Sequence, residues 1–109
     1  MINNVIFLDK ENQINKVLRD QRKVGNKVRI LFVSLWDITS ATLMDSLEAY
    51  SDRVPLYVAN SFTMPHAFVI HKVTKSPTLV TLLRDRYVKE DYLSRIYTEL
   101  GCEPVTFSI

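Results

Sequence analysis

Thiol chemistry in this chain would depend on one residue. Cys102 is the only cysteine among 109 residues, so one copy of the chain can form no internal disulfide and no thiolate cluster for a metal. It follows the last predicted helix, far in sequence from any candidate base that could activate a thiol. We therefore predict an ordinary cysteine. A single thiol also fits a reducing compartment, and we expect a cytoplasmic protein or a viral one made in a cytoplasm.

The two histidines do not predict a metal site. His66 and His71 are five residues apart around one short predicted helix, whereas helical zinc ligands four apart share a face. No cysteine or group of carboxylates lies beside them. The sequence also has no glycine-rich phosphate loop, no Ser-His-Asp order and no paired-carboxylate motif. We therefore predict neither a metal nor a cofactor.

A short polar turn from Asp37 to Ser40 is the strongest candidate site. Asp and Ser are preferred N-cap residues, and the helix dipole favours a carboxylate at the N-terminus by roughly 0.3–1 kcal/mol. Two interpretations stay open, a polar recognition site or a helix cap alone. The neighbouring Trp36 is either an anchor for a partner, because Trp is enriched at binding hot spots, or a half-buried lid over the adjoining helix.

Positive charge is concentrated near the first predicted helix. This group is diluted by Asp20 and lacks the interleaved aromatic residues that stack on bases. The formal charge of +2 is far from the basic excess typical of nucleic-acid-binding domains. We expect a solvated helix face and regard nucleic-acid binding as the weaker interpretation. The group consists of Lys16, Arg19, Arg22, Lys23, Lys27 and Arg29.

The composition is that of an ordinary globular domain. Apolar residues make up 47% of the chain and charged residues 24%, which is typical of neither a disordered nor a membrane protein. The length favours a single domain over residues 1–109. No segment approaches the roughly 20 apolar residues of a membrane span, and residues 1–10 do not have the pattern of a secretory signal.

Short β-branched runs alternate with segments of helical period, which predicts an α/β or α+β domain. Residues 28–35 are nearly all apolar, as in a strand buried on both faces, and should form the centre of the sheet. The other strands are expected over residues 4–8, 54–59 and 77–83. A weaker terminal edge strand is expected over residues 104–109.

Helices are expected between these strands, each with its own start or stop signal. The first is capped by Asp9 and ends at Gly25-Asn26, and the second covers about residues 40–50. The third opens with Thr63-Met64-Pro65 and runs to about residue 72, and the last ends at Gly101.

Two anchors make the chain resemble thioredoxin-fold proteins. The run VRILFVSLW followed by DITS stands where a thioredoxin has an apolar strand and then Trp-Cys-x-x-Cys. The run IHKVTKSPTLVTL stands where it has a helix end and then the cis-proline loop. Nearly the whole chain takes part in the resemblance. It implies a three-layer α/β fold with a mixed central sheet and flanking helices, and a cis peptide bond at Ser76-Pro77.

The resemblance breaks at the residues that carry the redox chemistry. Asp37 and Ser40 stand in place of the two cysteines, so both the reactive thiolate and the resolving thiol are missing. By the same comparison, Leu31 and Val58 replace the buried Asp and Lys that manage protons beneath the disulfide. An apolar pair costs less in a core than a charged pair without a task. The resemblance therefore implies a site that no longer does redox chemistry.

The segment after residue 83 also departs from the resemblance. Only residues 84–88 are available for the hairpin and second edge strand that thioredoxins have before the last helix. We therefore expect the second edge strand to be truncated, with residues 104–109 covering the exposed edge.

The resulting prediction is a redox-inactive thioredoxin-like interaction or structural module. Its small size would fit an accessory protein of a phage. Two alternatives stay open: a divergent thiol-disulfide or glutathione-handling protein using Cys102 or a partner's cysteine, and a nucleic-acid accessory protein using the basic first helix. In the main prediction, a protein or extended peptide binds between two loops formed by Trp36, Asp37, Ile38, Thr39 and Ser40, and by Lys75, Ser76 and Pro77.

Overall fold

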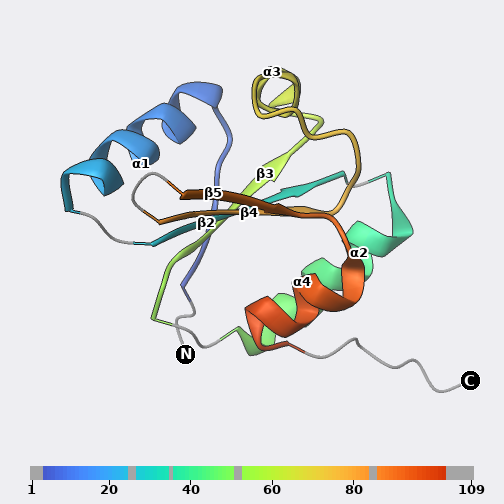
Figure 1. Ribbon diagram of the computed structural model, residues 1–109. Helices are drawn as coiled ribbons and strands as arrows, with labels where there is room; N and C mark the ends of the chain where they lie inside the picture. The colour runs from blue at the N-terminus through green and yellow to red at the C-terminus, as the bar shows by residue number, and fades with distance from the viewer. Residues whose placement is uncertain (1–3, 25–26, 35, 51–52, 84–85, 103–109) are drawn as a thin grey trace, which may run out of the picture.

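The computed structural model describes residues 4–24, 27–34, 36–50, 53–83 and 86–102. Within these residues the strands are β1 (Val5–Phe7), β2 (Val28–Val33), β3 (Leu56–Asn60), β4 (Thr78–Leu83) and β5 (Arg86–Glu90). They form one sheet in the order β1-β3-β2-β4-β5 (Figure 1). β1, β3 and β2 are mutually parallel, β4 is antiparallel to β2, and β5 is antiparallel to β4.

Helices cover both faces of this sheet. The described chain contains α1 (Glu11–Val24), α2 (Ile38–Ser46), α3 (Pro65–Ile70) and α4 (Leu93–Leu100), and a 3-10 turn, η1 (Leu47–Ala49), extends α2. Figure 1 shows α1 and α3 on one face and α2 and α4 on the other. The predicted three-layer arrangement is therefore confirmed. None of the helices in these residues has the length and apolar character needed to cross a membrane.

β2 is the central strand, and all six of its residues are buried. Side chains alternate between the faces of a strand, so Leu31 and Val33 pack under α2 and α4, whereas Ile30 and Phe32 pack under α1 and α3. Leu31 pairs with Val58 across the parallel strands, and both are buried. The prediction of an apolar Leu31–Val58 pair in the core is confirmed.

Arg29 is a correction to the predicted solvated basic face. It lies in β2 and is buried. Its Nη1 donates a hydrogen bond to the Tyr50 hydroxyl at 3.2 Å, and that hydroxyl donates to the Val54 carbonyl. A buried guanidinium is retained only when it has polar partners. Arg29 therefore belongs to the interior of the fold.

The helix starts differ in detail from the predicted caps. α1 begins at Glu11, and Asp9 is not its cap; the Gln13 Oε1 instead accepts hydrogen bonds from the backbone N–H groups of Asp9 and Lys10 at 2.8 and 2.9 Å. α3 starts at Pro65 after Met64, whose side chain makes no capping bond. At the other end of the chain, Gly101 terminates α4 in the left-handed conformation, at φ 67°.

β5 corrects the expectation of a truncated edge strand. Arg86 to Glu90 pair continuously with Leu83 to Leu79 of β4. β5 can reach five paired residues because the connection is short: β4 ends at Leu83 and β5 begins at Arg86. The expected stop at Gly25-Asn26 and the expected terminal strand at 104–109 lie outside the described residues.

Candidate functional site

Asp37 forms the turn that leads from β2 into α2. Its backbone N–H donates to the Ser34 carbonyl at 3.0 Å, and its extended backbone (φ −99°, ψ 124°) turns the side chain back over the helix end. The Oδ1 accepts from the Thr39 N–H at 3.1 Å. This satisfies one of the amides that the first turn of a helix leaves without a partner. α2 therefore begins at Ile38, two residues before the predicted start.

Ser40 is completely buried behind this turn. Its Oγ accepts from the Ser34 N–H at 3.3 Å and donates to the Asp37 Oδ2 at 3.5 Å. The hydroxyl thus joins the end of β2 to the cap of α2. Ser40, predicted among the partner-contact residues, acts from inside the turn and offers no exposed side chain.

The two predicted loops meet at Asp37. The Ser76 Oγ donates to the Asp37 Oδ2 at 3.1 Å, although the two residues are 39 positions apart. The Ser76-Pro77 peptide bond is cis, as predicted. The Thr78 hydroxyl donates to the Lys75 carbonyl at 2.7 Å and closes this loop on itself. Asp37 is therefore more than a helix cap, because it also attaches the proline loop to α2.

Lys75 and Pro77 differ in what they offer to a partner. Pro77 is buried directly before β4, whereas Lys75 is exposed and its Nζ lies 4.0 Å from the Asp91 Oδ2. An exposed pair at this distance contributes little to stability. The Lys75 side chain therefore stays largely exposed to solvent.

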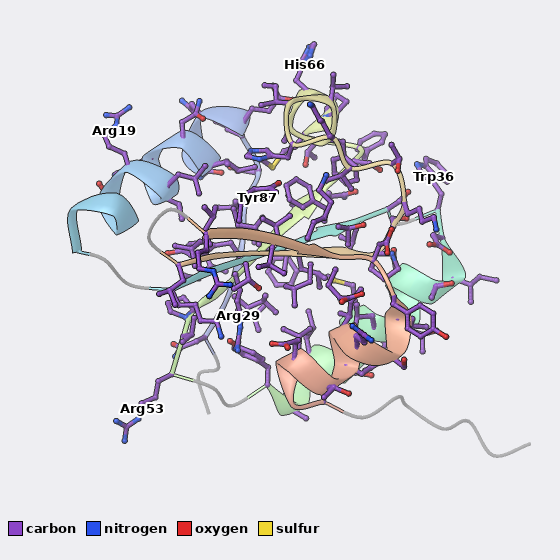
Figure 2. All side chains as sticks on the ribbon, viewed as in Figure 1. Arg19, Arg29, Trp36, Arg53, His66 and Tyr87 are labelled. Atoms are coloured by element: carbon purple, nitrogen blue, oxygen red, sulfur yellow. The ribbon has the colours of Figure 1, made fainter. Side chains whose placement is uncertain are left out.

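Large apolar side chains stand exposed beside the joined loops. Trp36 is 81% exposed, Ile38 83% and Phe62 70%, and Figure 2 shows Trp36 projecting from the surface. The rings of Trp36 and Phe62 meet edge to face with centroids 6.5 Å apart. Trp36 is therefore not a half-buried lid over α2. We call Trp36, Ile38 and Phe62 the Trp36 patch.

Phe62 is the member of this patch that the sequence analysis missed. It follows β3, and its N–H donates to the Asn60 Oδ1 at 3.1 Å, in a turn that directs the chain away from the sheet. The ends of adjacent parallel strands lie at the same edge of a sheet. An aromatic residue directly after β3 could therefore have been expected near Trp36, which follows β2.

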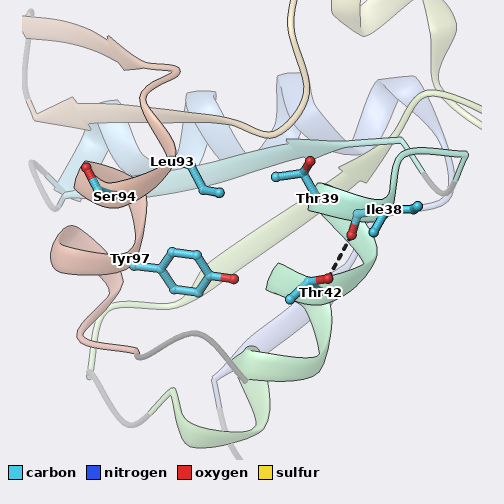
Figure 3. Close-up of a pocket in the computed structure, with 6 residues that line it drawn as sticks. All are labelled: Ile38, Thr39, Thr42, Leu93, Ser94 and Tyr97. Atoms are coloured by element: carbon cyan, nitrogen blue, oxygen red, sulfur yellow. Dashed lines mark hydrogen bonds between the residues drawn. The ribbon is translucent and has the colours of Figure 1, made fainter. Parts of the chain in front are cut away.

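A hollow adjoins the patch between α2 and α4. It has a volume of about 410 Å³ and is lined by Ile38, Thr39, Thr42, Leu93, Ser94 and Tyr97 (Figure 3). The Thr42 hydroxyl donates to the Ile38 carbonyl at 2.9 Å, so this polar group is engaged within α2. Ile38 and Thr39 thus belong both to the predicted loop and to an apolar recess.

Cys102 lies apart from these loops. It follows the C-terminal end of α4, whereas the hollow is lined from the first turns of that helix. The thiol is buried in the core and donates to the Leu100 carbonyl at 3.6 Å. Burial raises the pKa of the Cys102 thiol. A raised pKa lowers the thiolate fraction, which is the nucleophilic form.

The histidines have structural surroundings. His66 is exposed on α3, and its backbone N–H donates to the Glu11 Oε1 at 2.7 Å (Figure 2). The His71 ring stacks on Tyr87 with centroids 6.4 Å apart. Burial and then the charge of Lys89 lower the pKa of His71. Among the residues that the structure describes, no group of three or more His, Cys, Asp or Glu side chains could hold a metal ion.

No family model matches the sequence, and a search of curated proteins returns no significant match. Solved structures do share the fold. A thioredoxin of Fasciola hepatica superposes with a TM-score of 0.72 at 15% identity, over 88% of this chain and 96% of that one. An oxidised thioredoxin of Arabidopsis thaliana gives 0.67 at 17% identity, over 93% and 95%. A Nicotiana alata thioredoxin gives 0.69 at 11% identity, over 93% of each chain.

These similarities span almost the full length of both chains. With one cysteine, the sequence has no Cys-x-x-Cys pair. The chain therefore has a thioredoxin-like fold, with a mixed five-stranded sheet and four α-helices in its described residues, and lacks the paired cysteines.

Proposed function

We propose that this chain is a redox-inactive thioredoxin-like module that binds an extended segment of a partner protein across the Trp36 patch. The observation that carries the proposal is the Ser76–Asp37 hydrogen bond of 3.1 Å. It fixes the proline loop against the start of α2, directly beside exposed apolar side chains. A globular protein rarely leaves such side chains clustered unless they contact something.

The chemistry of the loops favours binding over thiol exchange. Disulfide exchange requires a thiolate that forms a mixed disulfide, and a carboxylate and a hydroxyl occupy the turn instead. Both groups are engaged within the protein, since Asp37 accepts from Thr39 and Ser76 and Ser40 is buried. Beneath them, Leu31 and Val58 form an apolar pair. What this surface offers to a partner is therefore apolar contact area and backbone groups.

The patch and the hollow suggest how a segment is held. Trp side chains are frequent binding hot spots because one ring removes a large apolar area from water. Ile38 belongs to the Trp36 patch and also lines the hollow, together with Leu93 and Tyr97. We propose that the segment lies across Trp36 and places one apolar side chain in this hollow. The backbone beside Ser76 supplies strand-like hydrogen bonds.

A capture experiment tests this function. The tagged protein is used to capture partners from a lysate of the organism that produces it, and Trp36→Ala and Ile38→Asp are compared with the unmodified chain. Both variants should keep the circular dichroism spectrum and lose the partner. The matched control is Phe7→Ala, which removes an exposed aromatic residue on the edge strand β1 that does not belong to the patch. Retention of the partner by Trp36→Ala would contradict the proposal.

The same preparation separates the two alternatives. Neutralising Lys16 and Arg19, exposed residues of α1, should leave capture unchanged; loss of capture here would favour electrostatic binding of a nucleic acid. The purified protein should not reduce the disulfides of insulin above background. Activity that disappears in Cys102→Ser would instead favour a thiol-disulfide or glutathione-handling function.

We place this function in the cytoplasm, where a chain with one buried thiol needs no disulfide for stability. An accessory role in a phage is consistent with the small size of the module and is part of the proposal. Fractionation of the cells that produce the protein tests the cytoplasmic location.

A further inference from the structure

Among the residues that the structure describes, no strand pairs with the outer side of β5. β5 is the outermost strand, next to β4 only, and lies at the front in Figure 1. Within the described residues, no backbone hydrogen bond outside the sheet involves Arg86 to Glu90. Val88, at the centre of the strand, is 54% exposed. An edge strand of five residues without proline or a bulge can accept another strand.

The two faces of β5 carry different side chains. Tyr87 and Lys89 point to the α3 side, where the Tyr87 ring stacks on His71 and the Lys89 Nζ donates to the Lys72 carbonyl at 2.7 Å. Strand alternation places Arg86, Val88 and Glu90 on the α4 side. The Glu90 Oε1 accepts from the Tyr92 N–H at 2.9 Å, which holds this carboxylate in place at the end of the strand.

We propose that β5 pairs antiparallel with the β5 of a second copy of this chain, about a two-fold axis that passes at Val88. In this register Arg86 lies opposite Glu90 of the second copy, and Glu90 lies opposite Arg86. Val88 lies opposite its own equivalent. Directly opposed residues share a face and interact, and opposite charges there are favourable. On the other face Tyr87 lies opposite Lys89, an arrangement that suits a cation–π contact.

Charge complementarity selects this register over its neighbours. A two-fold axis at Lys89 would place two ammonium groups directly opposite each other, which is unfavourable. An axis at Tyr87 would leave Arg86 opposite Val88 and remove both ion pairs. Of these three registers, only the axis at Val88 places Arg86 and Glu90 opposite residues of opposite charge and Lys89 opposite an aromatic ring. Within its own chain, the Glu90 Oε2 lies 4.0 Å from the Arg95 Nη1, so the pair with Arg86 adds a second cation beside this carboxylate. Isologous pairing of this kind closes at a dimer, so the edge does not propagate into a fibre.

The interface is small, because one strand contributes five residues. Interfaces below the usual range of about 1,200 Å² form weak and reversible complexes. The dimer is therefore expected as a concentration-dependent equilibrium, measured by sedimentation velocity at protein concentrations up to about 1 mM.

Charge reversal tests the register. Arg86→Glu places a second carboxylate opposite Glu90 of the other copy, and Glu90→Arg places a second guanidinium opposite Arg86. Each variant alone should therefore dimerise at least ten-fold more weakly than the unmodified chain. A mixture of the two variants pairs each introduced charge with one of opposite sign and should form a heterodimer. Circular dichroism checks that each variant is folded, since Glu90→Arg also removes the bond to Tyr92.

A cross-linking variant gives a second measurement. In Val88→Cys the new thiols lie opposite each other across the axis, and oxidation with a copper–phenanthroline catalyst should link them much faster than the thiols of Phe7→Cys on β1. The unmodified chain, whose Cys102 is buried, supplies the background. Equal rates for the two variants would overturn the proposal. The proposal would also be overturned if the unmodified chain stayed monomeric throughout the concentration range. That result is expected if residues 103–109 or a different protein occupy the edge of β5. A mixture of Arg86→Glu and Glu90→Arg that stays monomeric would overturn it as well.

Discussion

Removing the Asp37 carboxylate should loosen both loops at once. Asp37→Ala deletes the cap on Thr39 and the acceptor for Ser76. Loss of an N-cap costs about 1 kcal/mol, and loss of a partly buried hydrogen bond to a charged group costs about as much again. The 3.5 Å contact with Ser40 is too long to add to this sum. We expect the free energy of unfolding to fall by about 2 kcal/mol.

A double-mutant cycle separates these two contributions. Asp37→Ala, Ser76→Ala and the double variant are unfolded in urea and followed by far-ultraviolet circular dichroism. The coupling energy between the two sites should be about 1 kcal/mol, well above the few tenths found for independent sites. Asp37→Asn serves as the control that keeps a side-chain acceptor for Thr39. A coupling energy below about 0.3 kcal/mol would refute the claim that this bond joins the loops.

Three further expectations concern the core, a titrating ring and the thiol. Leu31→Asp should destabilise the fold by several kcal/mol, more than Leu31→Ala in the same urea titration, because an unpaired carboxylate is then buried in β2. Because the pKa of His71 is lowered from its ordinary 6.5 by burial and by Lys89, the unfolded chain binds more protons than the folded one below that pH. Stability should therefore fall as the pH drops below 6.5, and His71→Gln should flatten this part of the pH profile. Cys102 should react slowly with iodoacetamide in the folded protein and much faster in urea, since its burial raises the pKa of the thiol; equal rates would show that it is accessible.

The interior of the fold follows from the sequence because burial leaves a regular pattern. The apolar run of β2 predicted the central strand, and the resemblance to thioredoxins predicted the Leu31–Val58 pair. Gly101 ends α4 because its left-handed backbone favours a residue without a Cβ atom. The meeting of the two loops was expected only through the resemblance, and the hydrogen bond between Asp37 and Ser76, 39 positions apart, was not predicted.

The surface features were harder to predict, for separate physical reasons. β5 has almost no buried side chain, so it lacks the alternation that marks a half-buried strand. Phe62 lies beside Trp36 because the ends of β2 and β3 meet at one edge of the sheet, and no local sequence pattern marks this contact. Arg29 was taken as a surface residue because charge is rarely buried, yet the Tyr50 hydroxyl provides a partner inside the fold.

The central position of β2 also determines how the molecule opens to solvent. Every residue of β2 is buried, and the strand is paired on both sides. Amide hydrogens in such a strand exchange with deuterium only when the whole domain unfolds, whereas those at a sheet edge exchange through local fraying. The exchange rate of β2 therefore reports the global free energy of unfolding under native conditions, without denaturant.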